Sequence, residues 1–226
     1  MTTILQQSLS GKQLIHFMPT EVSDDTKYIK GVSSYILRFA GTLINGQKAV
    51  INITGIKPFF DIIIPEEMPL SMFKTKLVKI LSNTLGSISK FGIEHISAFP
   101  LQGYHTEKKL YIRVTTWNHF DRYKALKIVC EVSISTASDD LNPTYYYHKV
   151  VCEKRLPLSS WVVLSNYSYK YKGNSLTNVY SFQVSVNNYN PISEDNYNNL
   201  LFSSALSWDR TFVLTWDIET YSSRKT

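Results

Sequence analysis

The chain has 226 residues, of which 43% are hydrophobic and 19% are charged, so it carries enough apolar side chains to form a folded core. This length corresponds to one large domain or two small ones. The formal net charge of +6 permits a polyanionic partner but does not by itself demand one. The two cysteines, Cys130 and Cys152, exclude a disulfide scaffold and a four-sulfur zinc site.

The N-terminal region predicts an antiparallel sheet. Strands are expected at 13–22, 33–44 and 48–56, which are rich in β-branched and aromatic residues. Asn45 and Gly46 lie between the second and third strands and predict a hairpin. A type I′ turn is expected there, because both of its central residues need a positive φ and Asn-Gly adopts it readily.

Residues 59–136 predict the element order β-α-β-β-α-β. The expected strands are 59–64, 92–99, 109–117 and 131–136, and the expected helices are 69–86 and 118–130. In the first helix, apolar residues that include Met72, Phe73 and Leu77 recur at helical spacing, and Gly86 is a plausible stop. This order is typical of a ferredoxin-like fold, so an α+β class with a β-rich N-terminal domain is predicted.

The remainder of the chain predicts strands again, within 144–157, 161–171 and 178–186. An Asn-rich stretch, 187–199, is interpreted as a linker between a domain at 1–186 and a final segment at 200–226. Residues 212–218 form a near-continuous apolar run, typical of a strand buried on both faces. Such a strand needs neighbours, so we expect it to be the first strand of a second domain that is truncated here.

Asp217 and Glu219 are the candidate catalytic and metal-binding residues. Side chains at positions i and i+2 of a strand point to the same face, so both carboxylates stand side by side at the end of the apolar run. Hard divalent cations such as Mg²⁺ prefer these oxygens, and a pair of metal ions held in this way hydrolyses phosphodiesters. The alternative is an ordinary solvated strand end, because Asp-x-Glu is a common sequence.

Other motifs give weaker signals. The five histidines have no zinc-ligand spacing, and no phosphate-binding loop or dinucleotide-binding glycine motif is present. Lysines and arginines are interleaved with tyrosines around 104–113, 145–155 and 167–172. Single-strand binders use such residues to neutralise phosphates and stack bases, although tyrosine is also an ordinary strand former.

The segment FVLTWDIETYS, residues 212–222, resembles the first exonuclease motif of the family B DNA polymerases. Upstream, the chain resembles the N-terminal domain of the polymerases of large DNA viruses, of the African swine fever virus type. The segments that carry this resemblance, in order, are 16–22, 41–64, 101–114 and 137–169, the last of which contains LPLSSW and YSY.

The resemblance implies a replicative DNA polymerase with a 3′–5′ proofreading exonuclease, which acts on a DNA primer-template and deoxynucleotides. It implies an RNase H-like exonuclease domain that begins at 200–226, with Asp217 and Glu219 as ligands of a two-metal Mg²⁺ site. The N-terminal domain would bind DNA and guide the template strand. The remaining exonuclease and polymerase acids lie downstream in the family, so this piece alone is expected to be inactive. No processivity factor is indicated.

Two alternatives remain open at this point. One is a standalone RNase H-like nuclease, and the other is a β-rich nucleic-acid-binding module without enzymatic activity. The reading frame after Thr226 distinguishes them, because only a polymerase continues into a palm domain. The N-terminus lacks a signal-peptide pattern and no apolar run reaches about 20 residues, so an intracellular protein is expected. The resemblance to viral polymerases implies the host cytoplasm, in a viral factory, or the nucleus.

Overall fold

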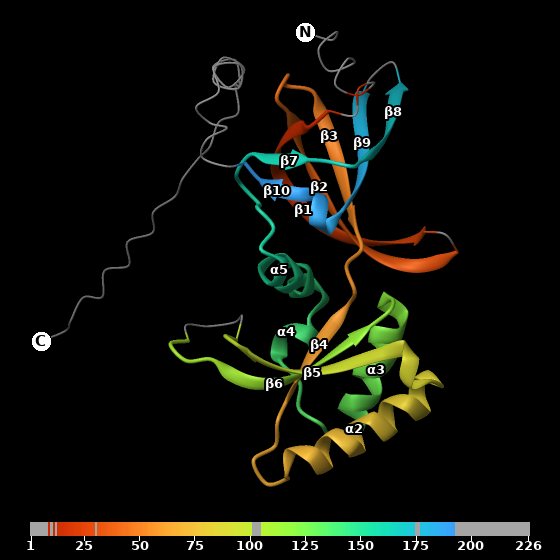
Figure 1. Ribbon diagram of the computed structural model, residues 1–226, viewed down its shortest axis with the longest axis vertical. Helices are drawn as coiled ribbons and strands as arrows, with labels where there is room; N and C mark the ends of the chain where they lie inside the picture. The colour runs from red at the N-terminus through yellow and green to blue at the C-terminus, as the bar shows by residue number, and fades with distance from the viewer. Residues whose placement is uncertain are drawn as a thin grey trace, which may run out of the picture.

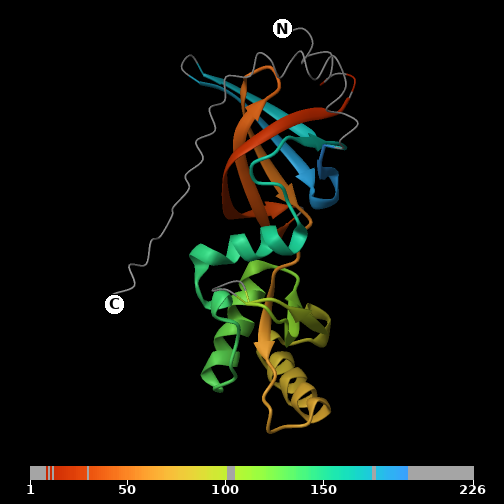
Figure 2. The same cartoon turned by 90° about the vertical axis from the view of Figure 1, so that its left-hand side faces the viewer.

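The computed structural model describes residues 9, 11, 13–29, 31–100, 105–174 and 177–192. These residues form an upper lobe built on a seven-stranded sheet and a lower lobe built on a three-stranded sheet with helices (Figure 1). Helix α5 (Pro143–Lys154) lies between the two lobes (Figure 2). The predicted mixed α+β class is therefore confirmed.

The upper sheet has the strand order β10-β7-β1-β2-β3-β9-β8. Its strands are β1 (Ile15–Ile29), β2 (Val32–Leu43), β3 (Lys48–Thr54), β7 (Val162–Leu164), β8 (Ser168–Asn174), β9 (Thr177–Ser185) and β10 (Tyr189–Pro191). Neighbouring strands are antiparallel except β3 and β9, which run parallel with Ile51 opposite Phe182. The chain thus leaves this sheet after β3, builds the lower lobe, and returns to complete the sheet.

The β2–β3 hairpin lies where it was predicted, but its turn is of another type. Gly46 donates its N–H to the carbonyl oxygen of Leu43 at 2.8 Å, and Leu43 donates to the carbonyl oxygen of Gln47 at 2.8 Å. Gly46 has a φ of 79°, whereas Asn45 is absent from the residues with positive φ. The predicted type I′ turn is therefore wrong, and the loop is a type I turn followed by a left-handed glycine.

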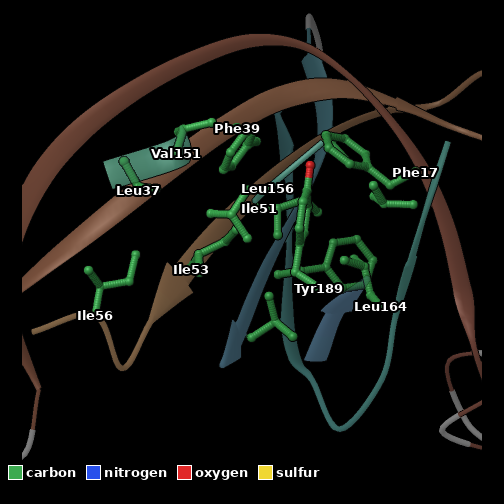
Figure 3. Packing of buried hydrophobic residues seen from close by; sticks show 14 of the residues in the cluster. Phe17, Leu37, Phe39, Ile51, Ile53, Ile56, Val151, Leu156, Leu164 and Tyr189 are labelled. Atoms are coloured by element: carbon green, nitrogen blue, oxygen red, sulfur yellow. The ribbon is translucent and has the colours of Figure 1, made fainter. Parts of the chain in front are cut away.

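The core of the upper lobe lies between the curled sheet and the C-terminal part of α5 (Figure 3). The sheet contributes fully buried side chains such as Leu37, Phe39 and Ile51, and the α5 region contributes Val151 and Leu156. Burial of such side chains stabilises the fold by about 1.5–3 kcal/mol each. The helix is therefore part of the core of the upper lobe and not a connector on its surface.

Residues 187–192, expected in an Asn-rich linker, belong instead to the folded body. The short 3-10 helix η2 (Val186–Asn188) leads into β10, which pairs with β7. Tyr189 is 2% exposed, its ring stacks on Phe39 at 5.0 Å, and its hydroxyl donates to the carbonyl oxygen of Pro157 at 3.0 Å. The burial of Tyr189 therefore keeps this segment in the folded body although most of the residues around it are polar.

The lower sheet has the strand order β4-β6-β5. The elements of this lobe are β4 (Phe59–Ile63), α2 (Leu70–Leu85), η1 (Ile88–Lys90), β5 (Phe91–Ala98), β6 (Lys109–Thr116), α3 (His119–Glu131) and α4 (Ser138–Leu141). The predicted order β-α-β-β-α is present. The last predicted strand, 131–136, is not formed, because α3 continues to Glu131 and only one isolated bridge joins Thr136 to Ile62.

The two long helices of the lower lobe pack against one face of its sheet. Helix α2 buries Phe73, Leu77, Leu81 and Leu85, spaced by four residues, whereas Met72 from the predicted apolar face is 63% exposed. The helix ends at Gly86, as predicted, in the left-handed conformation with a φ of 75°. None of the helices in the described ranges is long and apolar enough to cross a bilayer.

Residues 144–157 were expected to form a strand, but most of them form helix α5. Three consecutive tyrosines favour a strand by propensity. Packing decides otherwise, because Tyr146 and Val150 are four residues apart and are 1% and 0% exposed. A helix buries both against the same neighbours, and Pro143 suits the first turn of a helix.

A buried network of ion pairs fixes α5 to the lower lobe. The ammonium of Lys149 lies 2.9 Å from Oδ2 of Asp61 on β4 and 2.7 Å from Oδ2 of Asp140 on α4. Arg113 on β6 makes two bonds to Asp61, at 2.8 and 3.1 Å, and also pairs with Glu153 on α5. Burial raises the pKa of Asp61, but hydrogen bonds from Arg113 and Lys149 outweigh it and hold the pKa below its usual value.

Arg122 on α3 extends the same network. Its guanidinium donates to the carbonyl oxygen of Phe59 at 2.8 Å and to Oδ1 of Asp140 at 3.1 Å. The guanidinium carbon lies 3.6 Å from the centre of the Tyr146 ring, and the hydroxyl of Tyr146 accepts the N–H of Phe59 at 3.0 Å. Elements β4, β6, α3, α4 and α5 therefore share one set of charged hydrogen bonds.

We expect Lys149→Met to lower the free energy of unfolding by about 3–5 kcal/mol, because it removes the cation that Asp61 and Asp140 share. Asp61 then keeps only Arg113 and Asp140 keeps only Arg122, so the buried network is left with uncompensated negative charge. The matched control is Lys127→Met, since Lys127 makes an exposed ion pair with Glu131 at 3.8 Å and should contribute less than about 1 kcal/mol. Denaturant unfolding of both variants measures the difference. Equal losses would show that the buried network does not stabilise the fold.

Candidate nucleic-acid interface

A cleft of about 670 Å³ opens between the two lobes at the C-terminal end of α5. Residues from both lobes line it, so we call it the interlobe cleft. Its polar lining residues are Lys57, Glu94, Arg113, Thr115, Glu153, Lys154, Arg155, Ser185, Asn187 and Asn190. Because β3, β6, β9 and α5 all end or pass here, side chains distant in sequence meet at one surface.

The connection between β3 and β4 forms one wall of the cleft. Gly55 has a φ of 82°, which a residue with a side chain adopts only at a cost, and it turns the chain out of the upper sheet. Ile56, 5% exposed, then anchors the connection in the upper core. Lys57 follows and its ammonium lies 4.6 Å from the centre of the Trp117 ring, so the connection presents a cation at the junction of the lobes.

The end of α5 forms the opposite wall. Arg155 adopts the left-handed conformation, with a φ of 51°. Its N–H donates to the carbonyl oxygen of Cys152 at 3.1 Å, and the N–H of Leu156 donates to that of Val151 at 3.0 Å. This is a Schellman motif, in which glycine usually occupies the left-handed position. The chain therefore holds an arginine at the cleft in a backbone conformation that disfavours it.

The charged residues that line the cleft differ in their availability to a partner. Arg113 is 6% exposed and is paired with Asp61 and Glu153. Lys57, Lys154 and Arg155 are exposed, and none of the three makes an ion pair within the described residues. Together with the exposed carboxylate of Glu94, these three cations leave a net positive charge on a cleft whose volume is that of a small-ligand pocket, which suits an anionic partner.

The predicted clusters of basic and tyrosine residues are only partly at the surface. Arg113 and Lys149 lie in the buried network, and Tyr146 is in the core, so these three are not available to contact a nucleic acid. Tyr169 and Tyr171 on the edge strand β8 are 43% and 50% exposed and lie on the same face. Their rings contact those of Phe182 and Tyr180 on the neighbouring strand β9, and together they form an aromatic surface that is separate from the cleft.

The predicted metal ligands Asp217 and Glu219 lie outside the described residues, so their assignment stays a prediction. Within the described residues, no group of three or more His, Cys, Asp or Glu side chains is arranged to hold a metal ion. Sequence reasoning missed the contributions of Lys57, Arg155 and Trp117 to one surface. Their positions depend on two turns and a helix end that no local pattern reveals.

No family model matches the chain. Over 212 residues it is 32% identical to the DNA polymerase beta of a Malawi tick isolate of African swine fever virus, and 30% identical to that of a Kenyan pig isolate. Each similarity covers 92% of this chain. The resemblance to the DNA polymerases of large DNA viruses is confirmed. The chain spans only 15% and 16% of the length of these two relatives.

Among solved structures, the family B DNA polymerase of the hyperthermophilic archaeon Pyrobaculum calidifontis is similar over 75% of this chain and 20% of its own. The sequence identity is 15% and the TM-score is 0.43. Both values are low, so the description of the fold is based on the helices and strands of this chain and not on this match. The relation to viral polymerases rests on the sequence identities.

Replacing Arg155 tests whether its backbone conformation is strained. Arg155→Gly should raise the free energy of unfolding by about 0.5–1 kcal/mol, because glycine adopts a positive φ without a steric cost. Ser133→Gly is the matched control, since Ser133 has a φ of 60° in the equivalent motif at the end of α3 and does not line the cleft. Thermal unfolding of both variants measures the gain. A loss of stability in Arg155→Gly alone would mean that the side chain supports the end of α5.

Proposed function

We propose that this chain is the N-terminal part of a family B replicative DNA polymerase with a 3′–5′ proofreading exonuclease. In this proposal the described residues bind DNA and guide the template strand. The parent protein extends a DNA primer on its template with deoxynucleotides. The observation that carries the proposal is the 32% identity to a viral DNA polymerase over 92% of this chain.

The interlobe cleft supports the DNA-binding part of the proposal. Lys57, Lys154 and Arg155 are exposed on it, and Asn187 and Asn190 add exposed amide groups. Lysine and arginine contacts to phosphates supply most of the sequence-independent affinity for nucleic acids. Amide and backbone groups complete such surfaces by hydrogen bonding to phosphates and sugars. The cleft therefore offers the chemistry that a DNA strand of any sequence needs.

The exonuclease part of the proposal rests on the residues at the end of the chain. Asp217 and Glu219 would hold Mg²⁺ as the first two acids of an RNase H-like domain that begins at 200–226. When bound, the metal ions activate water and stabilise the leaving oxygen of a phosphodiester. The other ligands would come from the much longer parent, so this chain alone should not hydrolyse DNA.

We also propose that the lower lobe is a ferredoxin-like unit. Its strand order β4-β6-β5, with α2 and α3 packed on one face, supports this proposal. The isolated bridge between Ile62 and Thr136 lies on the free edge of β4, where a fourth strand would pair. In this chain the fourth strand is reduced to that one bridge, which two backbone hydrogen bonds form, from Ile63 to Ser135 at 2.9 Å and from Ala137 to Asp61 at 2.8 Å.

The first test is the salt dependence of binding to single-stranded DNA. Each phosphate neutralised on a single strand contributes about −0.7 to the slope of log affinity against log salt concentration. Substituting alanine for Lys57, Lys154 and Arg155 together should therefore make this slope shallower by about 2. Fluorescence anisotropy of a labelled oligothymidylate over a range of salt concentrations measures it.

The matched control removes the same charge elsewhere, with alanine at Lys74, Lys76 and Lys79, which are exposed on α2. If the cleft contacts the strand, this control keeps most of the wild-type slope. Equal effects of the two triple variants would place the DNA elsewhere on the surface. No binding at low salt by the unsubstituted chain would refute the DNA-binding role.

The second test uses the full-length parent. Asp217→Ala combined with Glu219→Ala should abolish 3′–5′ exonuclease activity and leave primer extension nearly unchanged, because nucleotide addition uses acids of another domain. Degradation of a mismatched primer end and extension of a matched one measure the two activities. Wild-type degradation by the double variant would show that the two acids are a solvated strand end.

A further inference from the structure

A second, smaller pocket adjoins the interlobe cleft on the lower lobe. Its volume is about 370 Å³, and it shares Lys57, Glu94 and Thr115 with the cleft. The face of the lower sheet opposite α2 and α3 forms its floor, through residues of β5 and β6 that include Gly92 and Thr115, and Trp117 follows directly after β6. A strand bound along the cleft would therefore pass the mouth of this pocket.

Trp117 is unusually exposed for its size and yet fixed in orientation. Its side chain is 59% exposed, and its indole N–H donates to the carbonyl oxygen of Ser89 at 2.7 Å. Because much of the ring stays in contact with water, this hydrogen bond does not serve to bury apolar surface. It does give a rigid platform on which another flat ring can stack.

Gly92 leaves open space in front of this platform. A Cβ atom built on Gly92 meets no heavy atom within 4 Å, and its φ is not in the left-handed region. The backbone therefore does not require glycine there, although glycine weakens a strand. Glycine inside a strand often marks a site that a ligand approaches closely. The space beside Trp117 fits that explanation.

The chemistry around the pocket points to a base that carries a phosphate. The ammonium of Lys57 lies over one face of the Trp117 ring, 4.6 Å from its centre. A base would stack on the exposed part of the ring that Lys57 leaves free, and the ammonium would lie close enough to pair with its phosphate. Glu94 and Thr115 add a carboxylate and a hydroxyl at the border with the cleft. A base paired within a duplex cannot present its face to the ring.

We propose that the pocket bounded by Lys57, Gly92 and Trp117 is a stacking seat for one unpaired base of the single strand bound in the interlobe cleft. This inference rests on the proposed DNA-binding function and adds a residue-level account of it. The seat does not select among bases, because every base has a face that stacks on an indole. It makes the surface prefer single strands that carry bases over duplexes and over strands without bases.

The test compares an oligothymidylate with a strand of the same length that carries abasic sites. Gly92→Leu fills the seat, and Trp117→Ala removes the platform. Each should weaken binding of the oligothymidylate by about tenfold, as expected for the loss of one stacked base. Neither should change binding of the abasic strand or the salt slope, because the phosphate contacts remain. Ser97→Leu, an exposed position on the same strand outside the pocket, is the matched control.

Thermal unfolding of each variant checks that the fold is kept, and Trp117→Phe, which keeps an aromatic ring, should retain part of the affinity. If wild type and both seat variants bind the two strands alike while binding stays salt-dependent, the seat is refuted and the proposed DNA-binding function stands. If the unsubstituted chain does not bind single strands at all, both are refuted. A tenfold loss in the Ser97→Leu control would also refute the seat.

Discussion

The arrangement of the whole chain depends on one buried cation, the ammonium of Lys149. It lies within 3 Å of carboxylates from β4 and α4, and an unpaired charge at this depth would cost several kcal/mol. Helix α5 can therefore occupy only the position that keeps these pairs. The same helix places Tyr146, Val150 and Val151 in the upper core, so a charge in the lower lobe sets where the upper sheet lies.

The interlobe cleft is a consequence of this arrangement. Once α5 is fixed, its last turn must end beside the connection from β3 to β4, and both chain segments turn there in the left-handed conformation. At Gly55 the turn is made by the residue that tolerates it. At Arg155 it is made by a residue with a side chain, which adopts this conformation only at a cost.

Local patterns predict the regular parts of this fold and fail where tertiary contacts decide. The position of the hairpin at Asn45 and Gly46, helix α2 and its end at Gly86 follow from residue spacing and turn-residue preferences, although the type of the hairpin turn does not. Helix α5 does not, because the strand propensity of three tyrosines is overruled by the burial of Tyr146 and Val150 on one side. Likewise, no pattern tells that Arg113 and Lys149 are buried and paired whereas Arg155 is exposed. The predicted acids Asp217 and Glu219 depend on sequence alone, since they lie outside the described residues.

The pairing of β3 with β9 has a consequence for synthesis of the protein. Ile51 meets Phe182 only after more than a hundred intervening residues, including the whole lower lobe, have left the ribosome. Until then, β3 presents an unpaired edge rich in isoleucine and valine, which is prone to pair with other chains. Closing so long a loop is entropically costly and slows folding. The lower lobe is continuous in sequence from β4 to α4, so it can form before β9 is made. Helix α5, which lies between the lobes, then precedes the strands that return to the unpaired edge of β3.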